Sequence, residues 1–212
     1  MLAALRQCVR LWRADRAAAS TPLRYLYHCA AGRQIWAHPH ASLTRASNIA
    51  NHGLLMVGTD YYGFAHDRKL TLVRANGLLT FRGPYSIGRG CCLNIGSQAE
   101  ATFGTGYVNP NTTFVIKHRL TVGDDTAISW NCMFVDADWH ELTYDGRRPK
   151  DSAITVGDRV WIGCNTTLLA GAAVPNGCVV GAGSVVTRAF AEPNTLIASN
   201  PARVVRTGVS WT

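Results

Sequence analysis

The second half of the chain repeats itself every six residues, starting at Val156. Read in sixes, it gives VGDRVW, IGCNTT, LLAGAA, VPNGCV, VGAGSV and VTRAFA. The first residue of each hexad is a branched aliphatic, and the fifth is mostly small except for Phe190 in the last hexad. A period of six suits neither an amphipathic helix nor a simple β-meander. It is typical of a β-helix, in which each hexad forms one flat side and three hexads form one coil.

The hexad pattern also predicts which side chains point inward. We expect the aliphatic first residue and the small fifth residue to face the axis of the β-helix. Glycine occupies several second positions, at Gly157, Gly163 and Gly181. We expect these glycines to let the chain turn each corner, because glycine adopts positive φ at little cost. Each coil would bury its inner face only by stacking on the next coil.

Upstream of residue 120 the pattern is present but less regular. It is visible in IGRGCC (87–92), and again in VGDDTA (122–127) and ISWNCM (128–133), whereas only fragments such as LLMVG and LLTFRG occur between 35 and 81. The sequence therefore predicts an all-β fold whose β-helix starts irregularly. The segment 141–153, ELTYDGRRPKDSA, is polar and contains glycine and proline, so we expect an external loop. Long loops on a rigid scaffold often carry function.

The first 30 residues differ from the rest and predict a short helical arm. One side of this amphipathic segment is apolar and the other carries arginines. The apolar residues are Leu2, Leu5, Val9 and Trp12. The arginines interrupt the apolar run, so it does not resemble a signal peptide, and no run of about 18 apolar residues predicts a spanning helix. The arm could attach to an anionic membrane surface, or pack on its own domain or on a neighbouring subunit, which is the commoner arrangement.

Charge and cysteine content narrow the class of partner and the compartment. Hydrophobic residues make up 47% and charged residues 16%, which indicates a folded chain. The formal net charge of +8 favours anionic partners, although many soluble proteins are basic. No nucleic-acid-binding motif is present, so we expect no nucleic-acid partner. Seven cysteines without CxxC spacing favour free, buried thiols in a reducing cytoplasm over disulfides or a zinc site.

Three stretches resemble a known family. ITVGDRVWIG, GAAVPNGCVVGAGSVVTRAF and NPARVVR are similar to the hexapeptide-repeat acyltransferases, in particular the galactoside, maltose and polysaccharide O-acetyltransferase branch. The resemblance is strong over 120–206 and extends in weaker form from about 85. It implies a left-handed parallel β-helix over 31–212 that follows the helical arm at 1–30. It also implies a homotrimer with active sites between neighbouring subunits, and acetyl-CoA as acyl donor to a saccharide or glycan hydroxyl.

The resemblance assigns the catalytic base to His140, within VDADWHEL (135–142). In the family, a histidine just before the external loop deprotonates the acceptor hydroxyl, a task that suits an imidazole titrating near neutrality. Asp138 is the first candidate to orient His140, because alternate residues of a strand project to the same side. Asp136 and Glu141 are alternatives. A metal site built from the same acids and His140 is not predicted, since the family chemistry needs no metal.

Asn109 in GYVNPNTTF matches an asparagine that lies near the acceptor in the galactoside branch. Its amide could donate to a developing oxyanion or hold a sugar hydroxyl. Asn-Pro is equally a common turn dipeptide, so a purely structural role stays open. Aromatic faces pack well on sugar rings and on the pantetheine arm of coenzyme A. The resemblance places Trp161 of VWIG beside the cofactor, and Trp139 is a further aromatic candidate.

The resemblance also implies a set of positions that bind coenzyme A. Arginines can meet phosphates bidentately, and the turn after 199 would lie near the adenine, but a solvated C-terminal segment would explain the same arginines. Cysteine is a poor hydrogen-bond partner where relatives often have serine, as at position 164. The implied positions are Cys164, Ala182 and Thr187 along the pantetheine, Arg188, Arg203 and Arg206 at the phosphates, and Asn200, Pro201 and Ala202 near the adenine.

Other functions remain open at this point. An N-acetyltransferase of an amino sugar, or a transferase that uses another acyl-CoA or a xenobiotic acceptor, would have the same fold. A structural β-helix or a carbonic-anhydrase-like enzyme is a further alternative. The latter needs three histidines around zinc, and only His118 and His140 stand out. We expect residues 1–80 and the loop at 141–153 to shape the acceptor site, and a location in the cytoplasm, at the inner face of the membrane if the arm binds lipid.

Overall fold

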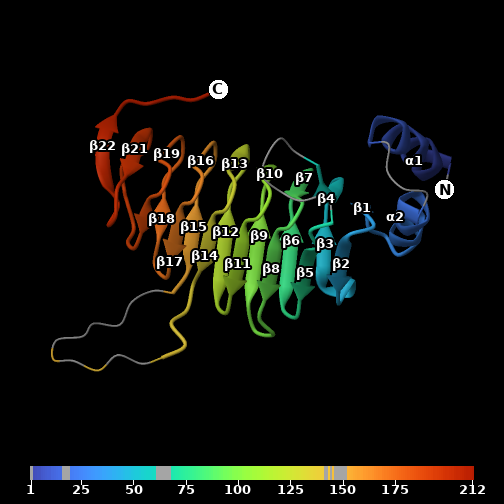
Figure 1. Ribbon diagram of the computed structural model, residues 1–212, viewed down its shortest axis with the longest axis horizontal. Coiled ribbons are helices and arrows are strands. Elements are labelled where there is room, and N and C mark those ends of the chain that lie inside the picture. Colours follow the sequence, from blue (N-terminus) through green and yellow to red (C-terminus); the bar gives the residue numbers. More distant parts are fainter. Residues whose placement is uncertain (1, 16–19, 61–67, 141–142, 144, 146–151) are drawn as a thin grey trace.

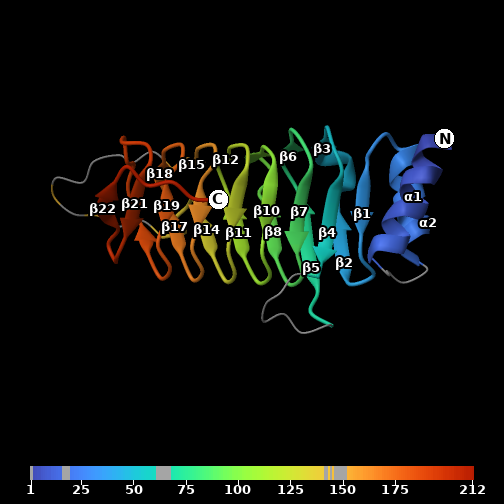
Figure 2. The same ribbon diagram turned by 90° about the horizontal axis from the view of Figure 1, so that it is seen from above.

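The computed structural model describes residues 2–15, 20–60, 68–140, 143, 145 and 152–212. It is an elongated stack of β-coils with two helices at its N-terminal end (Figure 1). In the described part of the chain the strands form three sheets, and consecutive strands from β1 to β20 pass in turn from one sheet to the next. Seen from above, the stack is a straight prism (Figure 2). Three parallel sheets of this kind are typical of a left-handed β-helix, so the predicted fold is confirmed.

Sheet A has nine strands in the order β1-β4-β7-β10-β13-β16-β19-β21-β22. Every pairing in it is parallel except the last, where β22 runs antiparallel to β21. Its strands are β1 (Ile35–Ala37), β4 (Leu55–Thr59), β7 (Tyr85–Gly88), β10 (Gly106–Val108), β13 (Thr126–Ile128), β16 (Trp161–Ile162), β19 (Val179–Val180), β21 (Thr195–Ala198) and β22 (Arg203–Thr207).

Sheets B and C are entirely parallel and have seven and six strands among the described residues. Sheet B contains β2 (Ala41–Thr44), β5 (Thr71–Ala75), β8 (Cys92–Ile95), β11 (Thr113–Ile116), β14 (Met133–Val135), β17 (Thr167–Leu169) and β20 (Val185–Val186). Sheet C contains β3 (Ile49–Asn51), β6 (Leu78–Phe81), β9 (Glu100–Phe103), β12 (Arg119–Val122), β15 (Ile154–Val156) and β18 (Ala173–Val174), and a 3-10 turn, η1 (Ala46–Asn48), precedes β3. We call the three edges of the prism A–B, B–C and C–A, after the sheets that each joins.

The interior of the C-terminal half follows the hexad pattern. First-position side chains from Val156 to Val186 are all at most 1% exposed. Fifth-position residues from Val160 to Ser184 are buried as well. The polar ones among them bond to backbone carbonyls, as when the Ser184 hydroxyl donates to the Gly181 carbonyl at 2.6 Å. Phe190, the exception in the pattern, is partly buried where the repeat ends. The predicted inward positions are therefore confirmed.

The N-terminal half also forms coils, although the sequence showed only fragments there. Its interior combines aliphatic side chains such as Val73 and Leu79 with aromatic rings, which continue into the middle coils. Phe81 and Phe103 stack at 5.2 Å between ring centroids, and Phe114 and Phe134 stack at 4.5 Å. These rings stand in register with Val156 and Leu168, two of the aliphatic first positions, so they interrupt the branched-aliphatic signal of the repeat.

The predicted role of the second-position glycines was wrong. Gly157, Gly163 and Gly181 do not have positive φ. The left-handed residue stands at the fourth position of the first five hexads instead, for example Arg159 (φ 51°) and Asn165 (φ 58°). The second position is glycine because the next coil lies against it. A Cβ on Gly163 would stand 2.6 Å from the backbone nitrogen of Ala182.

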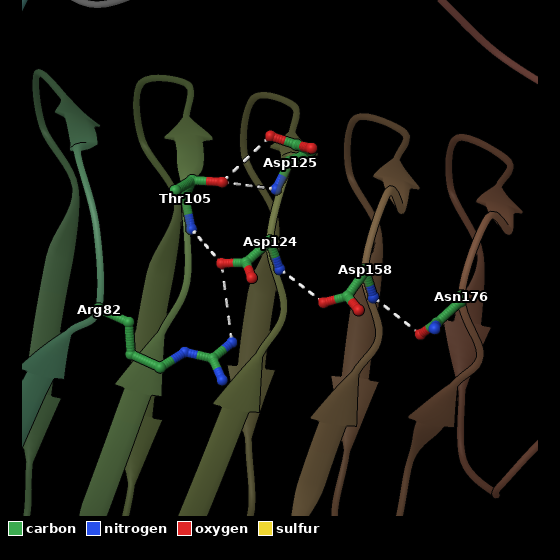
Figure 3. A network of polar contacts seen from close by, with 6 residues as sticks. All are labelled: Arg82, Thr105, Asp124, Asp125, Asp158 and Asn176. Atoms are coloured by element: carbon green, nitrogen blue, oxygen red, sulfur yellow. Dashed lines mark hydrogen bonds and ion pairs between the residues drawn. The ribbon is translucent and has the colours of Figure 1, made fainter.

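Along the C–A edge, each coil accepts hydrogen bonds from the coil before it (Figure 3). The backbone N–H of Thr105 donates to Asp124 Oδ1 at 3.0 Å, and that of Asp124 donates to Asp158 Oδ1 at 2.8 Å. The N–H of Asp158 donates in turn to Asn176 Oδ1 at 2.9 Å. Arg82 adds an exposed ion pair to Asp124 at 3.8 Å between Nη2 and Oδ1. This ladder caps backbone groups that the corner leaves without a sheet partner.

At this edge, the glycine of one coil lies directly against the Asp or Asn side chain of the next coil. A Cβ on Gly123 would collide with Asp158 Oδ1 and stand 2.6 Å from the Gly157 carbonyl oxygen. Glycine is therefore required on one coil so that the side chain of the next coil can reach back to it.

The two helices close the N-terminal end of the prism. Helix α2 (Ser20–Ala30) packs on β1, and α1 (Leu2–Asp15) packs on α2 (Figure 1). Tyr25 is fully buried and meets the Trp36 ring edge-on at 5.6 Å. The Arg24 guanidinium donates to the carbonyls of His38 and Ala41 at 2.6 and 2.8 Å. No helix in the described part of the chain is long and apolar enough to cross a membrane.

Replacing Gly123 by alanine should lower the free energy of unfolding by about 2 kcal/mol, since the new methyl overpacks a tight coil contact. Urea unfolding measures this change. Asp158→Ala, which removes only the exposed hydrogen bond, should cost about 1 kcal/mol or less. Equal losses in the two variants would contradict the steric explanation for the glycine.

Candidate active site

The predicted site residues lie along two different edges of the prism. Asn109 follows β10 and begins the A–B edge, where Cys164 and Ala182 occupy corners of later coils. His140 lies in the connection from β14 to β15, which belongs to the B–C edge. Thr187 and Arg188 follow β20 and belong to the B–C edge as well. Within one chain, His140 and Asn109 therefore lie at opposite edges of sheet B.

The A–B corners stack directly on one another. The backbone N–H of Asn165 donates to the Trp130 carbonyl at 3.0 Å, and that of Gly183 donates to the Cys164 carbonyl at 2.9 Å. The last corner contains Asn200 and Pro201, and the buried Ala202 donates its N–H to the Val185 carbonyl at 2.9 Å. These positions form a continuous line along the edge, as an extended ligand would require.

Sheet A bears an open groove of about 260 Å³ that brings Asn109 and Trp161 together. Four aromatic side chains contribute to its lining, and the sequence analysis did not single out three of them, Tyr107, Trp130 and Trp211. The lining residues are Tyr107, Asn109, Ala127, Ser129, Trp130, Trp161, Trp211 and Thr212. Aromatic walls with an amide and a hydroxyl suit a ligand that has both apolar and hydrogen-bonding parts.

Trp161 is held in place by its own hydrogen bond. Its Nε1 donates to Ser129 Oγ at 3.1 Å, while 42% of the residue remains exposed to the groove side of sheet A. The ring of Trp211 lies 6.3 Å from that of Trp161 between centroids, and its Nε1 donates to the Arg159 carbonyl at 2.8 Å. The C-terminal segment thus returns to the groove. Sequence reasoning missed Trp211 because it lies beyond the repeat and carries no motif.

Asn109 is nearly buried and makes the corner with its backbone. Its N–H donates to the Ile128 carbonyl at 2.8 Å, and its carbonyl accepts from Cys91 Sγ at 3.2 Å. The side-chain amide has no hydrogen bond to a described residue and lines the groove. The turn role and a ligand-binding role are therefore compatible, since they use different groups of the same residue.

Asp136 has a structural task that the sequence did not reveal. It is fully buried, and its two carboxylate oxygens accept three backbone N–H groups of the preceding coil. Oδ1 accepts from Lys117 at 2.7 Å, and Oδ2 accepts from His118 and Arg119 at 2.7 and 2.8 Å. With both oxygens occupied, Asp136 is a clamp between two coils, and it is not available to orient His140 or to bind a metal ion.

His140 stands at the surface beside two other exposed residues, Asp138 and Trp139. Among the described residues, neither His140 nor Asp138 has a hydrogen-bond partner. Glu141, the remaining alternative to Asp138, lies outside the described residues, as does most of the expected loop at 141–153. Within the described ranges, no group of three or more His, Cys, Asp and Glu side chains lies close enough to hold a metal ion.

The cofactor positions differ in exposure. Cys164 and Thr187 are half-buried, and Ala182 is exposed. Arg188 is exposed and lies over the Phe190 ring at 5.2 Å from its centroid. Arg203 and Arg206 are exposed on β22, where they pair with Ala198 and Leu196 of β21. Three exposed guanidinium groups at the C-terminal end are free of ion pairs to described acids, as a phosphate-binding role requires.

The cysteines are free thiols, as predicted. Burial raises the pKa of Cys91 to about 12 and that of Cys132 to about 11. A raised pKa keeps these thiols protonated at neutral pH, so they behave as small apolar side chains.

No family model matches the chain. A 24.8 kDa uncharacterised protein in the cps region of Klebsiella pneumoniae is 28% identical over 181 residues, covering 84% of this chain and 82% of the relative. The putative lipopolysaccharide biosynthesis O-acetyl transferase WbbJ of Escherichia coli K12 is 30% identical over 146 residues, covering 63% of this chain and 74% of the relative. The chain belongs to the hexapeptide-repeat acetyltransferases.

This hexapeptide-repeat acetyltransferase is also similar to the galactoside O-acetyltransferase of Escherichia coli K12, with 33% identity over 103 residues. That match covers 47% of this chain and 50% of the relative. Both of these Escherichia coli relatives are named as O-acetyl transferases. The predicted family and enzyme class are therefore confirmed, whereas the roles of single residues stay predictions.

Asp136→Asn should lower the free energy of unfolding by about 3 kcal/mol, because an amide cannot accept from all three clamped N–H groups. Thermal or urea unfolding gives the value. Asp138→Asn, two residues away and exposed, is the matched control and should change stability by less than about 0.5 kcal/mol. If Asp136→Asn were as stable as the wild type, the clamp would not be what holds the coils together.

Proposed function

We propose that this protein transfers the acetyl group of acetyl-CoA to a hydroxyl of a saccharide or of a surface-polysaccharide precursor. The names of two relatives support this acceptor class, one through lipopolysaccharide biosynthesis and the other through the cps region. The observation that carries the proposal is the aromatic groove of sheet A, which unites Asn109 and Trp161 along the edge where the cofactor positions stack. The reaction would take place in the cytoplasm.

The two-edge arrangement supports a homotrimer. His140 lies on the B–C edge, and Asn109 and Trp161 lie on or beside the A–B edge, so one chain alone does not form a complete site. A threefold arrangement of prisms brings one edge of each subunit against another edge of its neighbour. Each active site would then combine His140 of one subunit with the groove of the next.

In the proposed reaction, the neutral imidazole of His140 accepts the proton of the acceptor hydroxyl as its oxygen attacks the thioester carbonyl. The tetrahedral intermediate collapses, the carbon–sulfur bond breaks, and the leaving thiolate takes the proton back from the imidazolium. The products are an acetyl ester and free coenzyme A, with no acyl-enzyme. The Asn109 amide would donate either to the oxyanion or to the acceptor sugar.

Asp138 is the proposed orienting residue for His140. It is exposed and has no described hydrogen-bond partner, whereas the carboxylate of Asp136 is fully used by the preceding coil. A carboxylate that accepts from the second imidazole nitrogen would fix the tautomer in which the first nitrogen can accept a proton.

The coenzyme would lie along the A–B edge. Trp161, Cys164, Ala182 and the turn at 200–202 follow one another there, and they fit an extended pantetheine arm with the adenine at the C-terminal end. Arg203 and Arg206 on β22 would pair with the phosphates. Thr187 and Arg188 lie on the B–C edge, so they would reach the coenzyme bound to a neighbouring subunit.

A second candidate function is transfer to the amine of an amino sugar, or use of a longer acyl-CoA or a xenobiotic acceptor. The groove does not distinguish an amine from a hydroxyl. A panel of neutral saccharides, amino sugars and oligosaccharides, each with acetyl-CoA and a longer acyl-CoA, separates these cases.

His140→Ala should reduce acceptor-dependent release of coenzyme A by about a hundredfold or more, as loss of a general base predicts. Binding of acetyl-CoA, measured by calorimetry, should be nearly unchanged. Met133→Ala, an exposed change on the strand that leads into this segment, serves as the control. If His140→Ala retains full turnover with every active acceptor, His140 is not the base.

Mixing two inactive variants tests whether the site is shared between subunits. When His140→Ala and Asn109→Ala chains are refolded or co-expressed in equal amounts, about a quarter of the sites in a closed threefold ring should hold both native residues. Activity should rise from the level of either variant to about a quarter of the wild type. No recovery in mixed trimers, verified by mass, would place both residues of a site in one subunit.

A further inference from the structure

Helix α1 exposes an apolar stripe at the N-terminal end of the molecule. Leu2 is 75% exposed, Leu5 is 43% exposed and Val9 is 46% exposed, and Trp12 is exposed to 48%. Residues spaced by three and four lie on one face of a helix. An isolated exposed leucine is ordinary, but a full stripe along a 14-residue helix marks a contact surface.

The stripe is not the face with which α1 packs on its own domain. That packing uses Gln7, Cys8 and Leu11, which lie against α2 and the first coil. Tyr25 donates its hydroxyl to Gln7 Oε1 at 2.8 Å, and Cys8 is only 5% exposed. The sequence left open whether the arm packs on its own domain or faces a membrane. In the structure, α1 packs through one face and leaves the other face in solvent.

Positive charge borders this stripe. Arg6, Arg10 and Arg13 are exposed on α1. Residues 1–59 contain seven arginines and one acidic residue, so most of the net charge of the chain is concentrated at this end. Helix α2 exposes two further large apolar side chains, Leu23 at 71% and Tyr27 at 70%. The surface is therefore apolar along its centre and basic beside it.

This combination selects one occupant. An amphipathic helix with an apolar face and adjacent arginines lies in the interface of a bilayer that contains anionic lipids. A second copy of the chain would bring the same arginines against this surface, and like charges facing one another oppose association. The helices also lie at the end of the prism, beyond β1, so docking there leaves the long sides of the β-helix accessible (Figure 1).

We propose that α1 docks this protein on the surface of an anionic lipid bilayer, with Leu2, Leu5 and Val9 in the interfacial region and Arg6, Arg10 and Arg13 at the lipid headgroups. The proposal does not depend on which acceptor the enzyme uses. It concerns where the enzyme works, and it holds or fails separately from the acetyl-transfer reaction.

Co-sedimentation of the full-length protein with vesicles tests the proposal. The probes are phosphatidylcholine vesicles with and without phosphatidylglycerol. The wild type should bind only the anionic vesicles. Replacing Arg6, Arg10 and Arg13 together by glutamine should weaken binding on the order of a hundredfold, since each basic residue near the surface contributes about fivefold. Leu5→Gln with Val9→Gln should weaken binding at low salt as well.

The matched control replaces three exposed basic residues of the β-helix, Lys69, Arg74 and Lys117, by glutamine. It removes the same charge and should change vesicle binding only a few-fold. Far-UV circular dichroism and binding of acetyl-CoA verify that each variant is folded. If the two triple variants lost vesicle binding to the same extent, net charge alone would explain the effect, and the proposal would be overturned. The proposal would also be overturned if the wild type did not bind anionic vesicles. The same holds if the α1 variants changed the oligomer mass, measured by light scattering, and left vesicle binding intact.

Discussion

Parallel backbone pairing between successive coils is the constraint on which the rest of this structure depends. A coil of three short strands cannot bury its inner face alone, so every feature of a hexad must allow another coil to sit directly above and below it. The left-handed fourth residue, such as Arg159 or Asn165, turns the corner. The glycine at the second position, two residues earlier, leaves room for the next coil. Along the C–A edge, hydrogen bonds to Asp124, Asp158 and Asn176 connect each corner to the next (Figure 3).

The same constraint explains how the site is laid out. Because corners repeat at fixed places, residues far apart in the sequence align along an edge when they occupy the same position in their coils. Cys164 and Ala182 align in this way along the A–B edge, and Asn109 stands one position earlier, level with Gly163. His140 belongs to the B–C edge for the same geometric reason. An enzyme built on one straight prism can unite the two edges only by placing a second prism beside the first.

The parts of the molecule that repeat could be predicted from the sequence. Residues whose structural role occurs only once in the chain could not. The aliphatic first positions and the small fifth positions were confirmed because they follow from periodicity alone. The N-terminal coils were hard to recognise, since rings such as Phe81 and Phe103 stand where later coils have a branched aliphatic first residue. Asp136 looked like one of three similar acids near His140, and only the coil beneath it reveals three clamped N–H groups. Trp211 had no pattern at all, because its partner Trp161 is fifty residues away in the sequence and adjacent only in the fold.

The two ends of the prism are closed in different ways, and this difference bears on self-assembly. A stack of parallel coils has no intrinsic length, because the edge of the last coil offers the same backbone groups as every coil before it. At one end α2 covers the first strand. At the other end β22 reverses direction, and its five residues are all exposed, with arginines at both 203 and 206. A reversed, charged final strand is a poor template for the first coil of another molecule. The β-helix is thereby a finite body and does not continue into a fibre.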